Sequence, residues 1–332
     1  MTLILTQAEV RRVLPMDECI SLMGEVMKAV SQGKGLNPLR GGMSLPDGVG
    51  SLLTMPGYMQ EPKALGLKVI GIFPGNEGTV YESIQGLVMA FDPDRGIPLA
   101  IMDAGEITAI RTAAASGAAT KSLAREDASQ LAILGSGVQA RSHLEAMLCA
   151  RPIARVRVYS PTKAHRDGFA EEAASRHGIP VEATTTSEEA VRGADLICAV
   201  TSSGEPVVKS EWVAPGAHIN AVGAYTPSTR ELDTDTVARS RLFVDSRESA
   251  LAEAGDFLIP KEEGAIGDDH LLGELGNVLL GAIPGRQGPD DVTVFKSLGI
   301  AMEDVASAHP VYQRAKEGGV GTEVALEGLR QG

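Results

Sequence analysis

The stretch of sequence that decides the fold is Leu131-Ala132-Ile133-Leu134-Gly135-Ser136-Gly137-Val138-Gln139-Ala140. It has the order of a buried strand, a GxGxxA loop and a helix. Gly135 permits the tight turn, Gly137 lets the main chain touch a pyrophosphate, and Ala140 lets the helix pack close to the strand. The free N–H groups at the start of the helix then face the phosphates. The stretch predicts a dinucleotide site; an ordinary Gly-containing turn between a strand and a helix is the alternative.

The residues around this loop alternate between strands and helices. We expect helices over 138–150, up to 174 and over 187–192, and strands over 130–134, 155–159, 181–184, 196–201, 218–222 and 242–244. Short apolar strands that alternate with helices are typical of a parallel, doubly wound sheet. Together with the loop, they predict a Rossmann fold.

The flanking segments have a different character. Residues 7–33 carry apolar side chains near helical spacing, and residues 34–103 hold short apolar runs separated by turn residues. Such runs are typical of a mainly antiparallel sheet. The alanine-rich segment 107–124 and two C-terminal segments, 297–306 and 310–317, are expected to be helical. The fold class is therefore α/β, with an additional α+β portion.

Composition and charge restrict the partners. The 332 residues suffice for two domains, and 43% hydrophobic with 22% charged residues is typical of a globular protein. The net charge of −13 repels a phosphate backbone, so we expect neither nucleic acid nor an anionic membrane as a partner. No apolar stretch approaches the ~20 residues that span a bilayer, and the N-terminus lacks the pattern of a signal peptide.

The three cysteines are widely separated and odd in number. Cys19, Cys149 and Cys198 therefore suggest neither a disulfide framework nor a metal site. We expect no bound metal and a reducing, cytoplasmic location.

The end of the second strand predicts which dinucleotide binds. An NAD-selective site usually places Asp or Glu there to accept the ribose 2′-OH, and this sequence has neither. Instead it offers side chains that suit a 2′-phosphate, namely Ser160, Thr162, Lys163 and Arg166. We therefore expect NADP(H) to be preferred, with NAD(H) possible. The alternative is that Lys163 and Arg166 are ordinary solvated helix residues.

Two ionisable residues stand out in apolar surroundings. Lys68 lies within Leu67-Lys68-Val69-Ile70, and a buried lysine is costly unless it is paired or functional. Alternatively, Lys68 points outward from an edge strand. His143 follows the phosphate loop on its helix, where we expect a hydrogen-bonded structural histidine.

Several strings together resemble the ornithine cyclodeaminase/mu-crystallin family over roughly residues 3 to 318. They are Arg111-Thr112-Ala113-Ala114, the phosphate loop, Ile219-Asn220-Ala221-Val222-Gly223-Ala224, Thr293-Val294-Phe295-Lys296-Ser297-Leu298-Gly299 and Glu303-Asp304. The resemblance implies a Rossmann domain inserted into a substrate-binding and dimerisation domain, and a homodimer. The implied boundaries are 1–115 plus 300–320 for the substrate domain, 116–299 for the Rossmann domain and 321–332 for a flexible tail.

The resemblance also implies the chemistry, which is hydride transfer between the nicotinamide and the α-carbon of an amino or imino acid. Arg40 and Arg111 match the positions that bind the substrate carboxylate, and a guanidinium grips a carboxylate well. We expect Arg111 to begin its helix, where the dipole adds positive potential. Surface ion pairs are the alternative for both arginines.

Lys68 matches the family's active-site lysine, and we expect it to hydrogen-bond the substrate carboxylate or imine and to deliver a proton at nitrogen. Glu274 matches an acid near the substrate nitrogen, although a helix N-terminal acid is an equally good interpretation. Further positions are carried over as cofactor contacts, or else as packing and capping residues: Thr112, Val138, Gln139, Thr201, Val222, Lys296 and Ser297.

Two departures from the family pattern narrow the substrate. Cyclodeaminases carry acids that handle a distal amino group, and the corresponding positions here are Tyr225 and Leu53. We therefore expect a reductase of cyclic ketimine carboxylates such as pyrroline-2-carboxylate or piperideine-2-carboxylate, with Tyr225 among the substrate contacts. The alternatives are an alanine-like amino-acid dehydrogenase, an ornithine or lysine cyclodeaminase, and a non-enzymatic binder resembling a crystallin.

Overall fold

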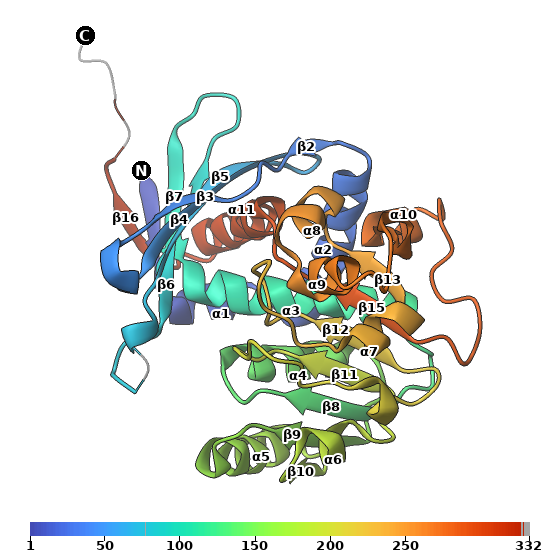
Figure 1. Cartoon of the computed structure of the whole chain (residues 1–332). Helices are drawn as coiled ribbons and strands as arrows, with labels where there is room; N and C mark the ends of the chain where they lie inside the picture. The colour runs from blue at the N-terminus through green and yellow to red at the C-terminus, as the bar shows by residue number, and fades with distance from the viewer. Residues whose placement is uncertain (77, 327, 329–332) are drawn as a thin grey trace. The chain divides into compact units, whose positions relative to one another are not determined.

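The computed structural model describes residues 1–76, 78–326 and 328. The chain divides into two compact units (Figure 1). The first unit comprises Met1–Arg111 with Ile300–Gly332, and the second comprises Thr112–Gly299. The division falls inside the long helix α3 (Ala104–Leu123).

The first unit contains one mainly antiparallel sheet, as expected from its short apolar runs. Its order is β16-β1-β7-β6-β5-β4-β2, and β3 pairs with β4. Among the described strands of this sheet, only β1 and β7 run parallel to each other. The strands are β1 (Thr2–Leu5), β2 (Gly35–Leu36), β3 (Gly41–Ser44), β4 (Ser51–Gln60), β5 (Lys63–Ile72), β6 (Ile84–Phe91), β7 (Pro98–Asp103) and β16 (Thr322–Val324).

One face of this sheet is covered by a C-terminal helix. The helices of the unit are α1 (Gln7–Val13), α2 (Met16–Ser31), the first part of α3, and α11 (Ala301–Glu317). Helix α11 packs on β4, β5 and β6 across the small residues Gly57, Gly66 and Ala90, which are cross-strand partners. A Cβ added to Gly66 would lie 2.8 Å from Val305, so the glycines permit the close approach of the helix.

Two expectations for the C-terminal region were wrong. A single helix, α11, continues through Pro310 in place of two separate helices, and its residues on both sides of the proline are buried. Part of the expected flexible tail is a strand, because Thr322–Val324 pairs with β1. The exposed edge of β1 supplies hydrogen-bonding partners that composition does not reveal. Residues 327 and 329–332 of that tail lie outside the described residues.

The second unit is a parallel sheet with the order β10-β9-β8-β11-β12-β15-β13-β14, which confirms the doubly wound fold. Its strands are β8 (Gln130–Leu134), β9 (Arg155–Tyr159), β10 (Val181–Ala183), β11 (Leu196–Ala199), β12 (His218–Ala221), β13 (Arg241–Val244), β14 (Leu271–Glu274) and β15 (Thr293–Lys296). The helices are α4 (Val138–Ala150), α5 (Lys163–His177), α6 (Ser187–Val191), α7 (Thr234–Arg239), α8 (Arg247–Glu253), α9 (Gly255–Glu262) and α10 (Leu275–Leu279). Short 3-10 turns occur at Pro46–Gly48 and Pro74–Asn76 in the first unit, and at Ser210–Trp212 and Asp268–His270 in the second.

The strand order creates a switch point beside β8. The chain runs from β8 outward to β9 and β10, then returns to β11 on the other side of β8 (Figure 1). In open parallel sheets, ligands bind at such a point, outside the carboxyl ends of the strands. The fold therefore marks the ends of β8 and β11 as the dinucleotide site.

The described residues contain no helix with the length and apolar character needed to cross a membrane. The same residues contain no group of three or more His, Cys, Asp or Glu side chains that could hold a metal ion. Cys19 and Cys198 are free thiols, and both are buried.

Candidate active site

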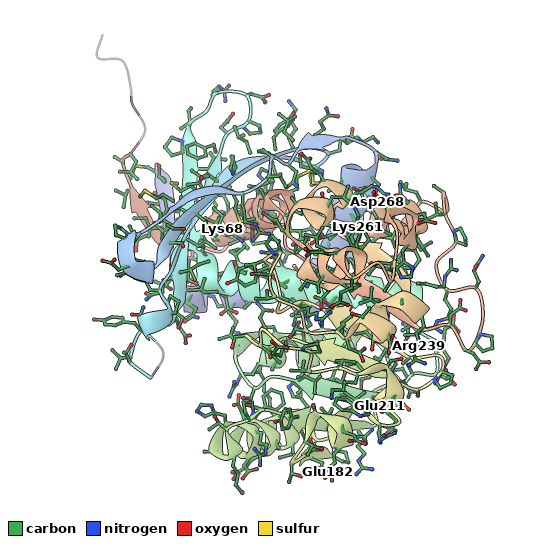
Figure 2. All side chains as sticks on the ribbon, in the orientation of Figure 1. Lys68, Glu182, Glu211, Arg239, Lys261 and Asp268 are labelled. Carbon is green, nitrogen blue, oxygen red and sulfur yellow. The ribbon has the colours of Figure 1, made fainter. Side chains whose placement is uncertain are left out.

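Lys68 lies in the core of the first unit, on the face of β5 that α11 covers (Figure 2). Its side chain is 2% exposed, and its Nζ lies 2.7 Å from Oδ2 of Asp304 on α11. The alternative of a lysine pointing outward from an edge strand is therefore wrong. The sequence could not show this pairing because more than half the chain separates the two residues.

Arg111 joins the same group from α3. Its Nε donates to Oδ1 of Asp304 at 2.8 Å, and its Nη1 donates to Glu303. Asp304 thus bridges Lys68 and Arg111, and the buried cluster holds two cations and two carboxylates. The expectation that Arg111 begins its helix was wrong, because α3 begins at Ala104 and Arg111 lies well inside it. The helix dipole does not supply the positive potential there; the side chain does.

The cluster leaves donors for a ligand. Among the described residues, Nη2 of Arg111 has no hydrogen-bond partner, and Nζ of Lys68 contacts only Asp304. Burial and the neighbouring Arg111 charge lower the pKa of Lys68 to about 8, although Asp304 opposes that shift. A lysine with that pKa can donate a proton near neutral pH.

Arg40 is half-buried and immediately precedes β3. The register pairs Gly41 with Thr54, and the next residue of β4, Met55, pairs with Lys68. Arg40 and Lys68 therefore belong to neighbouring positions on either side of β4. The carboxylate-binding role of Arg40 stays a prediction.

The phosphate loop of the second unit has the geometry that a pyrophosphate needs. Gly135 has φ +114°, and a Cβ there would lie 2.7 Å from the carbonyl oxygen of Val200 at the end of β11. Gly137 caps α4, and a Cβ there would meet nothing within 4 Å. Gly137 and Val138 are exposed, and Ala140 lies on the buried face of α4. These residues fit the cofactor, since the exposed helix end is open to an anion.

The end of β9 carries the residues predicted to bind a 2′-phosphate. Ser160 is buried and Thr162 stands at the start of α5. Lys163 is exposed and forms an ion pair with Asp167 one helical turn further along. Arg166 donates from Nη1 to the carbonyl oxygen of Ser160 at 3.0 Å. Both cations thus have partners within their own segment, which is compatible with either interpretation of them.

At the ends of β11, β12 and β15 the structure reveals residues that could not be identified from the sequence. Glu231 is fully buried and accepts hydrogen bonds from Thr201 and Gly223. Lys296, predicted to contact the cofactor, is fully buried in an ion pair with Asp256, 2.9 Å away. Its contact with the cofactor stays a prediction. The sequence holds no signal for this network, because Glu231 lies in a loop and Asp256 in a helix, each separated along the chain from the strand ends that it contacts.

The other predicted cofactor contacts differ in accessibility. Thr112 and Val222 are nearly buried, while Gln139 and Thr201 are half-buried. Ser297 is buried, and its Oγ has no hydrogen-bond partner among the described residues. A buried hydroxyl without a partner is costly, so a polar group of the cofactor would satisfy it.

Glu274 lies at the start of α10, and its Oε1 accepts a hydrogen bond from the main-chain N–H of Arg247 at 3.0 Å. This is the arrangement of a helix N-terminal acid, and a role at the substrate nitrogen stays a prediction. Tyr225 packs against the hydrophobic core of the second unit, and Leu53 is half-buried. His143 is fully buried between Ser116 Oγ (3.0 Å) and the Gln139 carbonyl oxygen (2.8 Å). Burial lowers its pKa to about 4, so His143 is a neutral structural residue.

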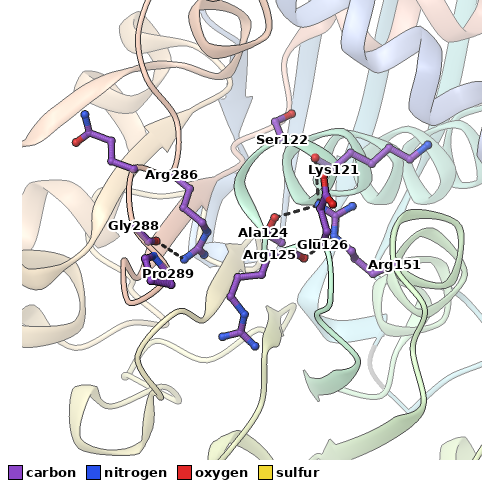
Figure 3. A pocket seen from close by; sticks show the side chains of 10 residues that line it. Lys121, Ser122, Ala124, Arg125, Glu126, Arg151, Arg286, Gly288 and Pro289 are labelled. Atoms are coloured by element: carbon purple, nitrogen blue, oxygen red, sulfur yellow. Dashed lines mark hydrogen bonds between the residues drawn. The ribbon is translucent and has the colours of Figure 1, made fainter.

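A basic cavity of about 410 Å³ lies elsewhere in the second unit (Figure 3). Two of its arginines donate to main-chain carbonyls: Arg151 to those of Lys121 and Ala124, and Arg286 to that of Leu123. They close the C-terminal end of α3. Arg286 also contacts the Ala217 carbonyl oxygen at the amino end of β12, so this cavity lies opposite the cofactor edge of the sheet.

Known proteins are similar to this one over nearly the whole chain. The sequence profile of the ornithine cyclodeaminase/mu-crystallin family matches residues 1–319. The Delta(1)-pyrroline-2-carboxylate reductase of Bacillus thuringiensis subsp. konkukian is 36% identical over 323 residues, which cover 97% of this chain and 99% of that protein.

Two solved structures are similar to this one. The first is the Delta(1)-pyrroline-2-carboxylate reductase of Thermococcus litoralis in complex with NADH and L-proline, with a TM-score of 0.94, 38% identity, and coverage of 97% of this chain and 100% of that one. The second is an archaeal alanine dehydrogenase dimer with bound NAD, with a TM-score of 0.92, 34% identity, and coverage of 98% and 99%.

Proposed function

The chain belongs to the ornithine cyclodeaminase/mu-crystallin family, and from this premise we propose that it reduces small imino acids with a nicotinamide cofactor. The proposed substrates are cyclic ketimine carboxylates such as pyrroline-2-carboxylate or piperideine-2-carboxylate. The observation that carries the proposal is the buried group of Lys68, Arg111 and Asp304, which offers donors to a carboxylate and a proton to a nitrogen.

The carboxylate of the imino acid is held by cations of the first unit. Nη2 of Arg111 is the donor with no protein partner among the described residues, and Arg40 supplies the second guanidinium. Two fixed cations orient the α-carbon as well as binding the acid. Substrate binding is accordingly assigned to the first unit and cofactor binding to the second.

Reduction of the C=N bond places a hydride on the α-carbon and a proton on nitrogen. The nicotinamide supplies the hydride when it is bound, and NAD(P)H becomes NAD(P)⁺. Lys68 supplies the proton from Nζ, because its pKa of about 8 keeps it protonated yet a competent acid at neutral pH. Asp304 contacts both Lys68 and Arg111 and so holds them in place, but its single negative charge offsets only one of their two positive charges.

The direct test is an assay with pyrroline-2-carboxylate and piperideine-2-carboxylate that follows NAD(P)H consumption. Turnover of at least one is expected, and no consumption with either would end the proposal. Arg111→Ala should abolish turnover while NADPH still binds. Retained activity in that variant would overturn the carboxylate assignment.

A second candidate is an alanine-like dehydrogenase, favoured by the similarity to the archaeal alanine dehydrogenase. It predicts NADH- or NADPH-dependent turnover of pyruvate with ammonia. A cyclodeaminase would instead release ammonia from ornithine without net cofactor consumption, and the apolar Leu53 and Tyr225 argue against it. A non-enzymatic binder would bind NADPH and turn over none of these compounds.

The cofactor preference is proposed as NADP(H), with NAD(H) possible. It is supported by the lack of an acid at the end of β9 and by Arg166 at the start of α5. Wild-type protein should show a lower KM for NADPH than for NADH, and Arg166→Ala should reduce that difference. The matched control is Arg176→Ala at the far end of the same helix. Clear preference for NADH would contradict the proposal.

A homodimer through the first unit is proposed as the assembly. Alternation places the row Pro56, Leu67, Met89, Ile101 and Ile4 on the face of the sheet opposite α11. These cross-strand partners form a continuous apolar strip that is exposed or half-buried. Light scattering should report a dimer for wild type and a monomer for Met89→Lys; a wild-type monomer would contradict the proposal. A cytoplasmic location is proposed from the free cysteines.

A further inference from the structure

One buried carboxylate ties two strand ends of the second unit together. Glu231 Oε1 accepts hydrogen bonds from the main-chain N–H and the hydroxyl of Thr201, both at 2.7 Å. Its Oε2 accepts one from the main-chain N–H of Gly223 at 2.6 Å. Thr201 follows β11 and Gly223 follows β12, which are adjacent in the sheet (Figure 1).

The two strand ends approach each other so closely that only glycine fits. A Cβ on Gly223 would lie 2.0 Å from the carbonyl oxygen of Thr201 and 2.6 Å from Oε1 of Glu231. The three hydrogen bonds to Glu231 supplement the main-chain bonds from Val222 and Gly223 to the carbonyl oxygen of Ala199. The carboxylate therefore fixes the position of Thr201 relative to Gly223 beyond the last ladder bond.

A second carboxylate fixes Glu231 and adds a third strand end. Oδ1 of Asp256 accepts the main-chain N–H groups of Glu231 (2.8 Å) and Leu232 (2.9 Å). Its Oδ2 pairs with Lys296 at the end of β15, whose Nζ also donates to the carbonyl oxygen of Ala224. Glu231 and Lys296 are fully buried and Asp256 nearly so, hence none of the three side chains is accessible to a ligand.

The position of this network in the fold indicates what it controls. A dinucleotide crosses the switch point with its pyrophosphate at the β8 loop and one half on either side. The adenosine half lies on the side of β9, because the residues that contact its ribose follow that strand. The nicotinamide half therefore takes the side of β11 and β12, whose ends Glu231 joins.

We propose that Glu231 is a positioning residue for the nicotinamide half of the cofactor. It acts through Thr201 and Gly223, which line the carboxyl ends of β11 and β12, and it leaves the phosphate loop and the adenosine side untouched. This inference rests on the dinucleotide site of the proposed function, although not on the identity of the imino acid.

Calorimetry with two ligands tests the proposal without any turnover. NADH contains both halves, and ADP-ribose lacks only its nicotinamide ring; 2′-phospho-ADP-ribose is the corresponding ligand for NADPH. In Glu231→Gln, one N–H of the strand ends must face the new amide NH₂, so we expect NAD(P)H to bind roughly 10- to 100-fold more weakly. ADP-ribose should bind as it does to wild type. The matched control is Glu263→Gln, an exposed glutamate that pairs with Arg230, and it should leave both affinities unchanged.

A merely structural role would give a different pattern, because general loosening weakens both ligands equally. Equal losses, or no loss for NAD(P)H, would overturn the proposal. Should Glu231→Gln fail to fold, Asp256→Asn decides the question, since its amide oxygen still accepts the Glu231 and Leu232 N–H groups while the ion pair to Lys296 is lost. It should selectively weaken NAD(P)H by a smaller factor, and an unselective effect would count against the proposal. Failure of wild type to bind either ligand would refute the dinucleotide site itself.

Discussion

Replacement of Asp304 by asparagine separates the charge of the bridging carboxylate from its shape. Asparagine keeps one oxygen for Nε of Arg111 but removes the negative charge 2.7 Å from Nζ of Lys68. Because Asp304 raises the pKa of Lys68 against the opposing effects of burial and Arg111, its loss should lower that pKa further below about 8.

The magnitude follows from the value of one pKa unit, about 1.4 kcal/mol. A hydrogen bond to a charged group contributes about 1.5–3 kcal/mol, which corresponds to a fall of one to two units. With a fall of one unit, the protonated fraction of Lys68 at pH 7 drops from about 90% to about 50%, and at pH 9 it drops roughly ninefold. The proton donor is lost as pH rises through its pKa, so the alkaline limb of the profile should move to lower pH.

The assay is kcat/KM for imine reduction from pH 6 to pH 10. Asp304→Asn should show its alkaline limb shifted down by at least one unit, with a near-normal rate at pH 6. Titration of the imine substrate affects the pH profiles of wild type and Asp304→Asn equally. A difference between the two profiles therefore reports the titration of a group on the enzyme. Asp94→Asn, which breaks the exposed pair with Lys63, is the control and should leave the profile unchanged. An unshifted limb, or one shifted to higher pH, would refute Lys68 as the proton donor.

Three further outcomes are expected. Gly135→Ala should lose NAD(P)H binding, because residue 135 has φ +114° and an added Cβ would lie 2.7 Å from a carbonyl oxygen. The control Gly168→Ala, on α5 where an added Cβ meets nothing within 4 Å, should bind NAD(P)H normally in the same titration. Lys68→Met should keep NADPH affinity but lose turnover at least 100-fold, the scale of general acid catalysis; stopped-flow rates near wild type would contradict that. Acidification from pH 6.5 toward 4 should destabilise the fold by about 1.4 kcal/mol per unit for each buried neutral histidine, since the unfolded chain binds more protons there. Urea unfolding at pH 7 and pH 5 checks this, with a shallower dependence expected for His143→Gln, whose wild-type pKa is about 4; an unchanged slope would exclude His143 as a source.

The sequence predicted features whose cause is local. The loop from Gly135 to Ala140 specifies its own turn, helix start and packing, and the short strands around it specify a parallel sheet. Lys68 stands out in the sequence because it is a charged residue within an apolar run. These inferences need only neighbouring residues.

The features that the sequence could not predict depend on distant partners. Asp304 and Glu303 pair with Lys68 and Arg111 across most of the chain, and a pattern of residue types carries no distance between such segments. The strand at Thr322–Val324 exists because β1 offers an unpaired edge, which the composition of the tail does not show. The sequence does not single out Glu231, because its burial cannot be read from its neighbours.

The packing of α11 on β4, β5 and β6 also sets the order in which the chain can fold during synthesis. The ribosome delivers strands β1 to β7 before the second unit, but the helix that covers the sheet only after it. Until then the glycines of that sheet have nothing to pack against, and Lys68 has no Asp304 to compensate its charge. The second unit, contained within Thr112–Gly299, meets no such delay. A nascent chain truncated before residue 300 should therefore hold a folded second unit and an unfinished first unit, with the cluster of Lys68, Arg111 and Asp304 assembled only after α11 has emerged.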